Sequence, residues 1–172
     1  MKNKLLALGL AFLLLLVLVS SGCTDENGEN GNGSDDEDLG DQVKQASSLK
    51  YTITVTHPEE GEFTQTFMAK NIGTDDVKLR MEWDSNDDEG IFILNHELKK
   101  AWIYSDGVWE DLSEWFEVWY DTYYVQQFED YMTELYDWTG GEYTYTEPSE
   151  GITVTFSGIQ IDPSLSDSLF EH

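Results

Sequence analysis

The most regular pattern in the chain is an alternation of apolar and polar residues at every second position. Tyr51, Ile53 and Val55 alternate with threonines, and the same period returns over residues 63–69 and 77–83. Such strands have one apolar and one polar face, which is typical of an antiparallel sheet covered on one side only. The segment 91–94 is apolar at every position, so we expect it to be a central strand.

A period of three and four residues predicts one long helix in the second half of the chain. Asp111 and Glu114 form a variant of the capping box at its start, and Gly140 follows its last turn. The apolar residues at this spacing are Phe116, Trp119, Tyr120, Tyr123, Phe128, Tyr131 and Leu135.

Shorter elements precede and follow this part of the chain. Residues 38–49 have the spacing of a short amphipathic helix, and residues 142–146 and 152–161 alternate as strands. In the last strand the apolar positions change from even to odd numbers, which predicts a β-bulge at Ser157-Gly158. The order of helix, about five strands, long helix and two strands indicates the α+β class.

The first 22 residues have the layout of a secretory signal. Lys2 and Lys4 precede an apolar run over residues 5–19, and three small residues lead to Cys23. This ending resembles a lipobox, which implies that the Cys23 thiol carries a lipid and that cleavage makes Cys23 the first residue. The alternative is an uncleaved signal anchor with an incidental thiol. Cys23 is the only cysteine, so no intramolecular disulfide can form.

An acidic spacer follows the cysteine. Residues 24–41 contain eight acids, no basic residue and one aliphatic residue, Leu39. Too little apolar surface is present to offset the entropy cost of ordering, so residues 23–41 are predicted to be the lipidated cysteine and a flexible tether. Asn32 begins an Asn-Gly-Ser sequon and is a candidate glycosylation site. The folded domain is then expected over residues 42–172.

The charge of the chain excludes one class of partner. Nine Lys and Arg against 35 Asp and Glu give a formal charge of −26, which repels the phosphates of nucleic acids. The same charge disfavours adhesion to anionic lipid, so membrane attachment is expected through the lipid anchor, at the extracytoplasmic face. A hydrophobic content of 40% excludes a disordered acidic chain.

No catalytic or metal-binding motif is present in the sequence. It contains no His-x-x-x-His pair, no Gly-x-Ser-x-Gly elbow and no glycine-rich phosphate loop. The acidic stretch that starts at Asp84 fails as a calcium loop, because Glu89 and Asn95 stand where glycine and glutamate are needed. We therefore predict no enzyme, no cofactor and no metal. The histidines are His57, His96 and His172.

Three segments together resemble a known family: LKYTITVTHPEEGEFTQTFMAKN, GIFILNHELKKAWIYSDGVWEDL and GIQIDPSLSDSLFEH. Over most of residues 39–172 they resemble the lipoprotein-carrier superfamily of LolA/LolB-like and LppX-like proteins. The resemblance implies a half-barrel of curved antiparallel sheet, with the long aromatic helix on its concave face around a hydrophobic cavity. It also implies binding of acyl chains or of a lipidated protein.

Aromatic residues of the predicted sheet and helix are the candidate ligand-binding residues. We predict that the aromatic residues of the strands line one face of the sheet and that those of the long helix pack onto the same face. A filled core is the alternative, although each buried hydroxyl or indole N–H then needs a partner, which an amphipathic pocket would supply. The candidate residues are Phe63, Phe67, Trp83, Trp102, Tyr104, Trp119, Tyr123 and Tyr131.

The sequence thus predicts a lipid-anchored extracytoplasmic protein that binds a hydrophobic or amphipathic ligand without catalysis. The alternative is a tethered acidic surface module that has a structural or interaction role. A cavity of several hundred Å³ distinguishes the first function from the second.

Overall fold

The computed structural model describes residues 38–58, 61–85, 89–147 and 151–172. These residues belong to one compact unit of the chain, which contains all of the buried hydrophobic residues. The predicted signal sequence, Cys23 and Asn32 lie outside the described residues. The unit combines an eight-stranded antiparallel sheet with one long helical segment, which confirms the predicted α+β class.

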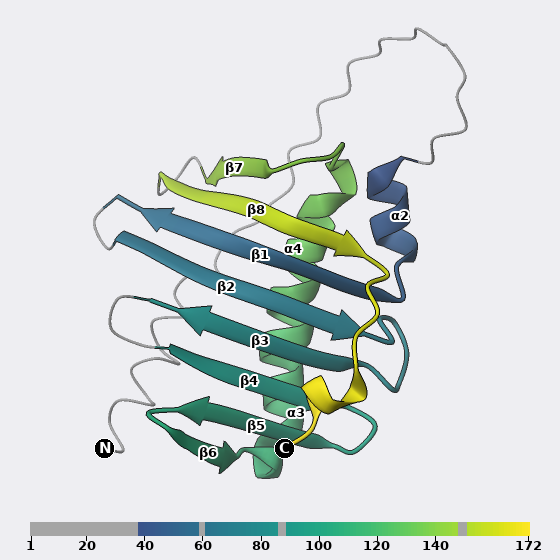
Figure 1. Cartoon of the computed structure of the whole chain (residues 1–172), viewed down its shortest axis with the longest axis vertical. Coiled ribbons are helices and arrows are strands. Elements are labelled where there is room, and N and C mark those ends of the chain that lie inside the picture. The colour runs from purple at the N-terminus through teal and green to yellow at the C-terminus, as the bar shows by residue number, and fades with distance from the viewer. Residues whose placement is uncertain (1–37, 59–60, 86–88, 148–150) are drawn as a thin grey trace, which may run out of the picture. The chain divides into compact units, whose positions relative to one another are not determined.

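The strands follow one another in a simple order across an open sheet, β6-β5-β4-β3-β2-β1-β8-β7. The first six form a continuous meander, and after the helical segment the chain returns to place β8 beside β1 (Figure 1). Their bounds are β1 Ser48–His57, β2 Gly61–Lys70, β3 Lys78–Asp84, β4 Glu89–Asn95, β5 Lys100–Ser105, β6 Val108–Asp111, β7 Tyr143–Glu147 and β8 Ile152–Ile161.

Residues 113–137 form a helical path of several types, called the long helix below. It crosses one face of the sheet, on the far side in Figure 1. Its parts are η1 Ser113–Trp115, α3 Phe116–Trp119, the π-helical η2 Tyr120–Phe128, α4 Glu129–Glu134 and η3 Leu135–Asp137.

The predicted capping box at the start of the long helix is wrong. Asp111 is the last residue of β6, where it pairs with Trp102, so it does not reach the N-cap position. Leu112 is the N-cap and makes no side-chain cap bond. The Asp111 carboxylate instead accepts a hydrogen bond from the Ser113 N–H at 2.8 Å.

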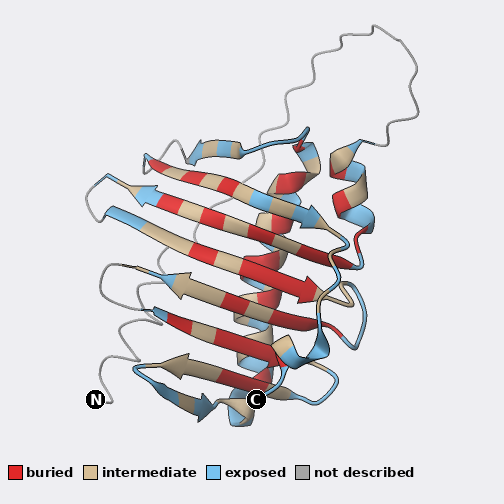
Figure 2. Cartoon of the chain, in the orientation of Figure 1, coloured by how far each residue is buried: buried red, intermediate tan, exposed pale blue. Residues whose placement is uncertain are grey.

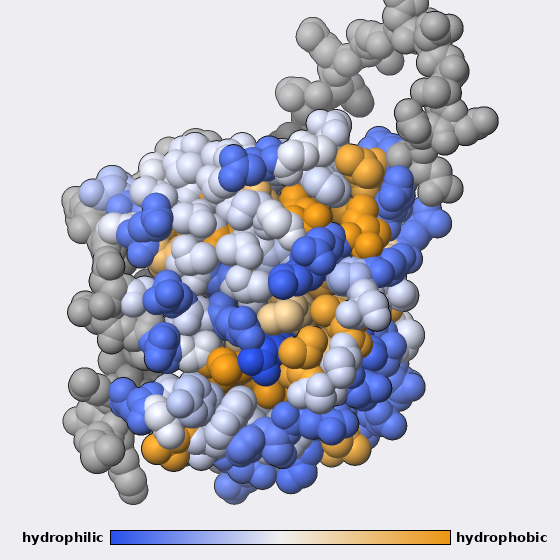
Figure 3. Space-filling view, viewed as in Figure 1, coloured by the Kyte–Doolittle hydropathy of each residue, from blue (hydrophilic) through white to orange (hydrophobic). Residues whose placement is uncertain are grey.

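The two faces of the sheet differ in composition, as the alternation predicted. On the helix-side face, alternate residues of neighbouring strands fall into register, for example Tyr51 with Phe67 and Phe67 with Met81. These positions are buried, which gives the banded strands of Figure 2. The opposite, tail-side face has rows of threonine, such as Thr144–Thr155–Thr54–Thr64. Figure 3 shows this side of the molecule, where pale and blue surface surrounds smaller orange areas.

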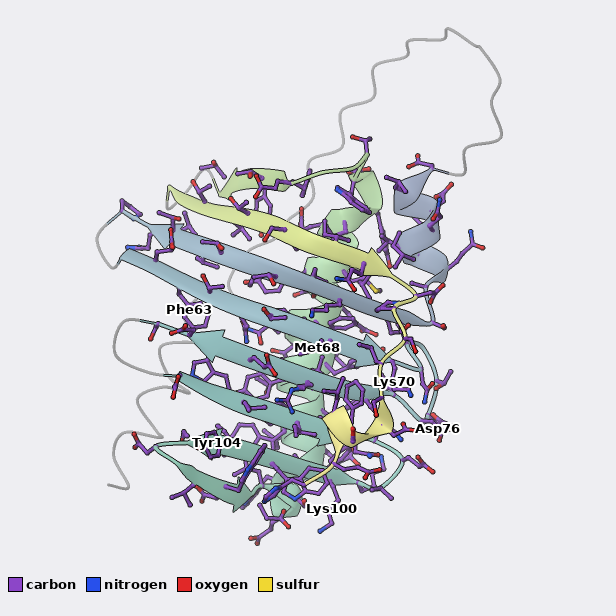
Figure 4. The ribbon with its side chains drawn as sticks, viewed as in Figure 1. Phe63, Met68, Lys70, Asp76, Lys100 and Tyr104 are labelled. Atoms are coloured by element: carbon purple, nitrogen blue, oxygen red, sulfur yellow. The ribbon has the colours of Figure 1, made fainter. Side chains whose placement is uncertain are left out.

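Part of the tail-side face is covered by the C-terminal segment, residues 162–172, which contains η4 Asp167–Phe170. Phe170 is fully buried there against Ile93 and Trp102. Lys70, labelled in Figure 4, lies 3.1 Å from the Asp167 carboxylate. A second, smaller core therefore forms on the face that the alternation in residues 51–83 predicted to be solvated.

The predicted β-bulge in the last strand is confirmed. The β1–β8 register shifts opposite Ser157–Gln160, and Gly158 has φ +60°.

The first helix, α2 Leu39–Gln45, begins three residues before the predicted domain start at residue 42. Residues 39–41 therefore belong to the domain rather than to the tether. They do so because Gly40 packs directly against the backbone of Tyr136 in η3.

Candidate functional site

The long helix carries two lengthwise stripes of side chains that are four residues apart. The first consists of Phe116, Tyr120, Tyr124 and Phe128, whose successive ring centroids are 6.1, 5.2 and 5.5 Å apart. The second consists of Trp119, Tyr123, Gln127 and Tyr131, in which the Trp119 and Tyr123 rings stack at 5.8 Å.

The π-helical part explains why these stripes run straight. In an α-helix two residues four apart differ by about 40° around the axis, so such a stripe winds around the helix. A π-helical turn contains more residues and turns the stripe in the opposite sense. Combining α3, η2 and α4 therefore keeps both stripes in contact with the sheet across several strands.

The second stripe lies over strands β4, β2 and β8 in turn. Tyr123 approaches Phe92 of β4, with ring centroids 4.4 Å apart. Tyr131 contacts Phe67 of β2 at 5.8 Å and Phe156 of β8 at 5.9 Å. Gln127 is halfway along the stripe and is therefore positioned over the strands between these contacts. The structure thus brings the predicted site residues Phe67, Tyr123 and Tyr131 into one layer, and Trp83 and Trp119 pack against the same core.

Gln65 and Trp83 belong to the sheet side of this layer. They lie opposite each other in the β2–β3 pair, and Trp83 lies opposite Gly90 in the β3–β4 pair. The Trp83 indole covers Gly90 so closely that a Cβ at Gly90 would overlap the ring. Gln65 is only 1% exposed.

Four polar atoms in this layer are buried and have no hydrogen-bond partner among the described residues. They are the Gln65 Oε1, Trp83 Nε1, Trp119 Nε1 and Gln127 Oε1 atoms. A buried polar atom without a partner costs about 1–3 kcal/mol, and native proteins contain few of them. Two donors and two acceptors thus face an apolar layer between the long helix and strands β2–β4. We call these four side chains the polar quartet.

Sequence reasoning missed both glutamines of the polar quartet. The available signal was the alternation itself. Gln65 lies between Phe63 and Phe67 at a position where the alternation predicts a side chain on the apolar face. Gln127 likewise falls four residues after Tyr123 and four before Tyr131.

Trp102 and Tyr104 are not part of this layer, which corrects the prediction that the sheet aromatics share one face. In β5 the residues Ala101 and Ile103 take the helix-side positions, since Ile103 pairs with Phe92. Trp102 packs instead in the smaller core on the tail-side face, and the Tyr104 ring lies 5.3 Å from that of Trp109.

Phe63 is on the helix-side face of β2, two residues before Gln65. It is half-buried near the start of β2, opposite Val55 (Figure 4). It therefore borders the layer at the β1–β2 hairpin end.

The layer contains tyrosine hydroxyls that stay protonated over a wide pH range. Burial raises the pKa of Tyr131 to about 12 and also raises the pKa of Tyr123. Burial raises the pKa of Tyr51 further above its usual range, and its hydroxyl donates to the Phe128 carbonyl at 3.3 Å. Such neutral groups can orient a bound molecule, and none of them is prepared for proton transfer near neutral pH.

Within the described ranges, no three His, Cys, Asp or Glu side chains are grouped so that they could hold a metal ion. No helix in the same part of the chain has the length and apolar character needed to cross a membrane. No family model matches the sequence, and neither the curated proteins nor the solved structures contain a significant match.

Proposed function

We propose that this domain binds an apolar or amphipathic ligand, such as a lipid or an acyl chain, between the long helix and the sheet. No bond is made or broken. The sheet would be the half-barrel of a lipoprotein carrier, with the helix on its concave face, and Cys23 would attach the protein to the extracytoplasmic side of the membrane. The observation that supports this function most is the unpaired polar quartet in an otherwise apolar layer.

An amphipathic ligand has the two properties that the layer requires. Its polar group would pair with atoms of the quartet, and its apolar part would leave water at a gain of about 25 cal/mol per Å². The strand ends at the β1–β2 hairpin extend beyond the long helix (Figure 1). Val55 and Phe63 lie there, and we expect the apolar part to lie along them while the helix shifts.

The second candidate, a tethered surface module, has an observation of its own. Around Tyr51 the layer is closely filled, because Phe67, Phe128 and Phe156 surround its ring at centroid distances of 5.1 to 5.9 Å. At these strands the aromatic residues form an ordinary core.

Native mass spectrometry separates the two functions. Residues 38–172 would be purified from cells without detergent and then mixed with 1-dodecanol or dodecanoate. A bound mass that organic extraction removes, or uptake of either probe, is the result expected for a carrier. A bare polypeptide that takes up neither probe would contradict the proposal and leave the surface module. For the anchor, a Cys23→Ser variant of the full chain should leave the membrane fraction of cells.

A further inference from the structure

The lysine and arginine residues that the structure describes all lie away from the part of the layer that contains the polar quartet. Lys44 is in α2, Lys99 is in the β4–β5 turn and Lys100 is the first residue of β5. The other four occupy tail-side positions of β1, β2 and β3, opposite in parity to the buried helix-side residues. They are Lys50, Lys70, Lys78 and Arg80. The long helix contains no basic residue. An anionic head group beside the quartet would therefore have no lysine or arginine partner among the described residues.

Among the described residues, carboxylates are likewise absent from the part of the layer that contains the quartet. The described helix-side positions of β1–β5, from Leu49 to Ser105, are apolar residues, glycine, serine and Gln65, with His57 at the hairpin end of β1 as the one further polar residue. The acids of the long helix are exposed, apart from Glu129 and Glu134, which are half-buried. A charged group that is buried without a partner is strongly disfavoured, so the layer selects against cations as well as anions.

The polar quartet specifies which neutral group fits. Its two indole N–H groups need acceptors, and its two glutamine oxygens need donors. A primary amide donates two hydrogen bonds and accepts two, so it can pair with all four atoms. A hydroxyl group donates one hydrogen bond and accepts two, so it pairs with both indoles and with one glutamine oxygen at a time. An ether only accepts, so it would leave the Gln65 and Gln127 oxygens unpaired.

We infer that the ligand is an uncharged amphiphile whose polar group is a hydroxyl or an amide, held by Gln65, Gln127, Trp83 and Trp119. This inference rests on the proposed function and narrows it to a ligand class. It excludes fatty acids, phospholipid phosphates and long-chain amines as the preferred ligands of this layer.

The first test compares four probes that share a twelve-carbon chain: 1-dodecanol, its methyl ether, dodecanoate and dodecylammonium. Binding to residues 38–172 is followed at pH 7.5 in 0.3 M salt by quenching of tryptophan fluorescence. Dodecanol is expected to bind about tenfold more tightly than each of the others, because only its hydroxyl serves both donors and acceptors. Equal or tighter binding of the ether or of either ion would overturn the inference and leave the proposed function standing. Failure of all four probes would overturn the proposed function itself.

The second test uses a matched pair of glutamine variants. Gln127→Leu should weaken dodecanol binding, and Gln127→Leu combined with Gln65→Leu should weaken it about tenfold to the level of the methyl ether, because the hydroxyl proton then has no glutamine acceptor. Gln126→Leu is the control, since Gln126 is exposed and its amide donates to Asp121. That variant should bind dodecanol like the unchanged protein.

Thermal unfolding of the ligand-free protein distinguishes a binding role from a structural one. Removing an unpaired buried oxygen should leave the unfolding temperature of Gln127→Leu unchanged or raised, while dodecanol affinity falls. A lower unfolding temperature together with unchanged dodecanol affinity would overturn the assignment. Gln65→Leu repeats the comparison on the sheet side, so the result does not depend on one variant folding.

Discussion

Gly90 determines where the Trp83 indole lies, and with it one donor of the polar quartet. The ring occupies the space that any larger residue at position 90 would need for its Cβ. The two residues are direct partners in the β3–β4 pair, so the ring cannot avoid such a side chain without leaving its place.

Gly90→Ala should therefore displace the Trp83 indole and destabilise the domain by about 1–3 kcal/mol, as overpacking does in other cores. Urea unfolding and the wavelength of tryptophan emission would measure the two effects. Ser105→Ala, the partner of Gly90 across β4–β5, is the control and should change neither. If Gly90→Ala behaves like this control, the described position of Trp83 is wrong.

Trp119 and Trp115 form a natural comparison at the start of the long helix. Trp119 stacks on Tyr123 and has a buried indole nitrogen, whereas Trp115 is 63% exposed. Trp119→Ala should reduce dodecanol affinity at least tenfold with the fold retained, because it removes both a donor and apolar contact. Trp115→Ala should have little effect. Circular dichroism checks folding, and a Trp119→Ala chain that unfolds would favour the filled-core alternative over binding.

At the scale of elements, period and parity in the sequence predict most of the fold. Strands such as β1 and the long helix follow from local periodicity, and even the bulge at Ser157-Gly158 is readable, since each depends on residues close in sequence. The face on which Trp102 packs was not readable, because strand aromatics are equally favourable on either side until a partner covers them. That partner is Phe170, which is distant from Trp102 in the sequence, so local periodicity does not predict the contact.

The candidate site was predictable only in part, for a similar reason. Phe67, Tyr123 and Tyr131 follow from their apolar spacing, and the structure brings them together. The π-helical turns are set by packing against the sheet, and propensity alone does not reveal them. Gln65 and Gln127 belong to the site because they are buried. Burial of a polar side chain cannot be predicted from its residue type, since glutamine is usually exposed.

Phe170 is the fully buried residue by which the C-terminal segment packs on the sheet. The ammonium groups of Lys70 and Lys78 donate to Asp167 and hold the pKa of this carboxyl below its usual range, but the carboxylate is exposed, so the ion pairs add little. Phe170→Ala should cost about 3–5 kcal/mol, measured by urea unfolding, and should make residues 162–172 susceptible to protease. Ser168→Ala serves as the control, since Ser168 is exposed. Equal stability of the two variants would show that Phe170 does not secure this segment.

At the scale of the whole molecule, buried tyrosines should make the domain sensitive to alkali. The pKa of Tyr131 rises from 10.0 to about 12 on folding, so between these pH values the folded chain keeps a proton that the unfolded chain has released. The contribution of this proton to the free energy of unfolding is fully present below pH 10. Above pH 10 it falls by about 1.4 kcal/mol per pH unit for each such tyrosine.

Urea unfolding at pH 9, 10 and 11 would measure this loss of stability. Tyr131→Phe should show a shallower decline above pH 10 than the unchanged chain, because phenylalanine has no proton to lose. Parallel declines in the two proteins would contradict the assignment of this proton to Tyr131.

The central claim is that a neutral amphiphile binds between the long helix and strands β2–β4. Photolabelling with a dodecanol that carries a diazirine in its chain, followed by peptide mass spectrometry, locates the ligand directly. The label is predicted on peptides containing residues 63–67 or 119–131, and excess dodecanol should compete it away. A label confined to the tail-side face around Trp102 and Tyr104, or one that dodecanol does not displace, would contradict the claim.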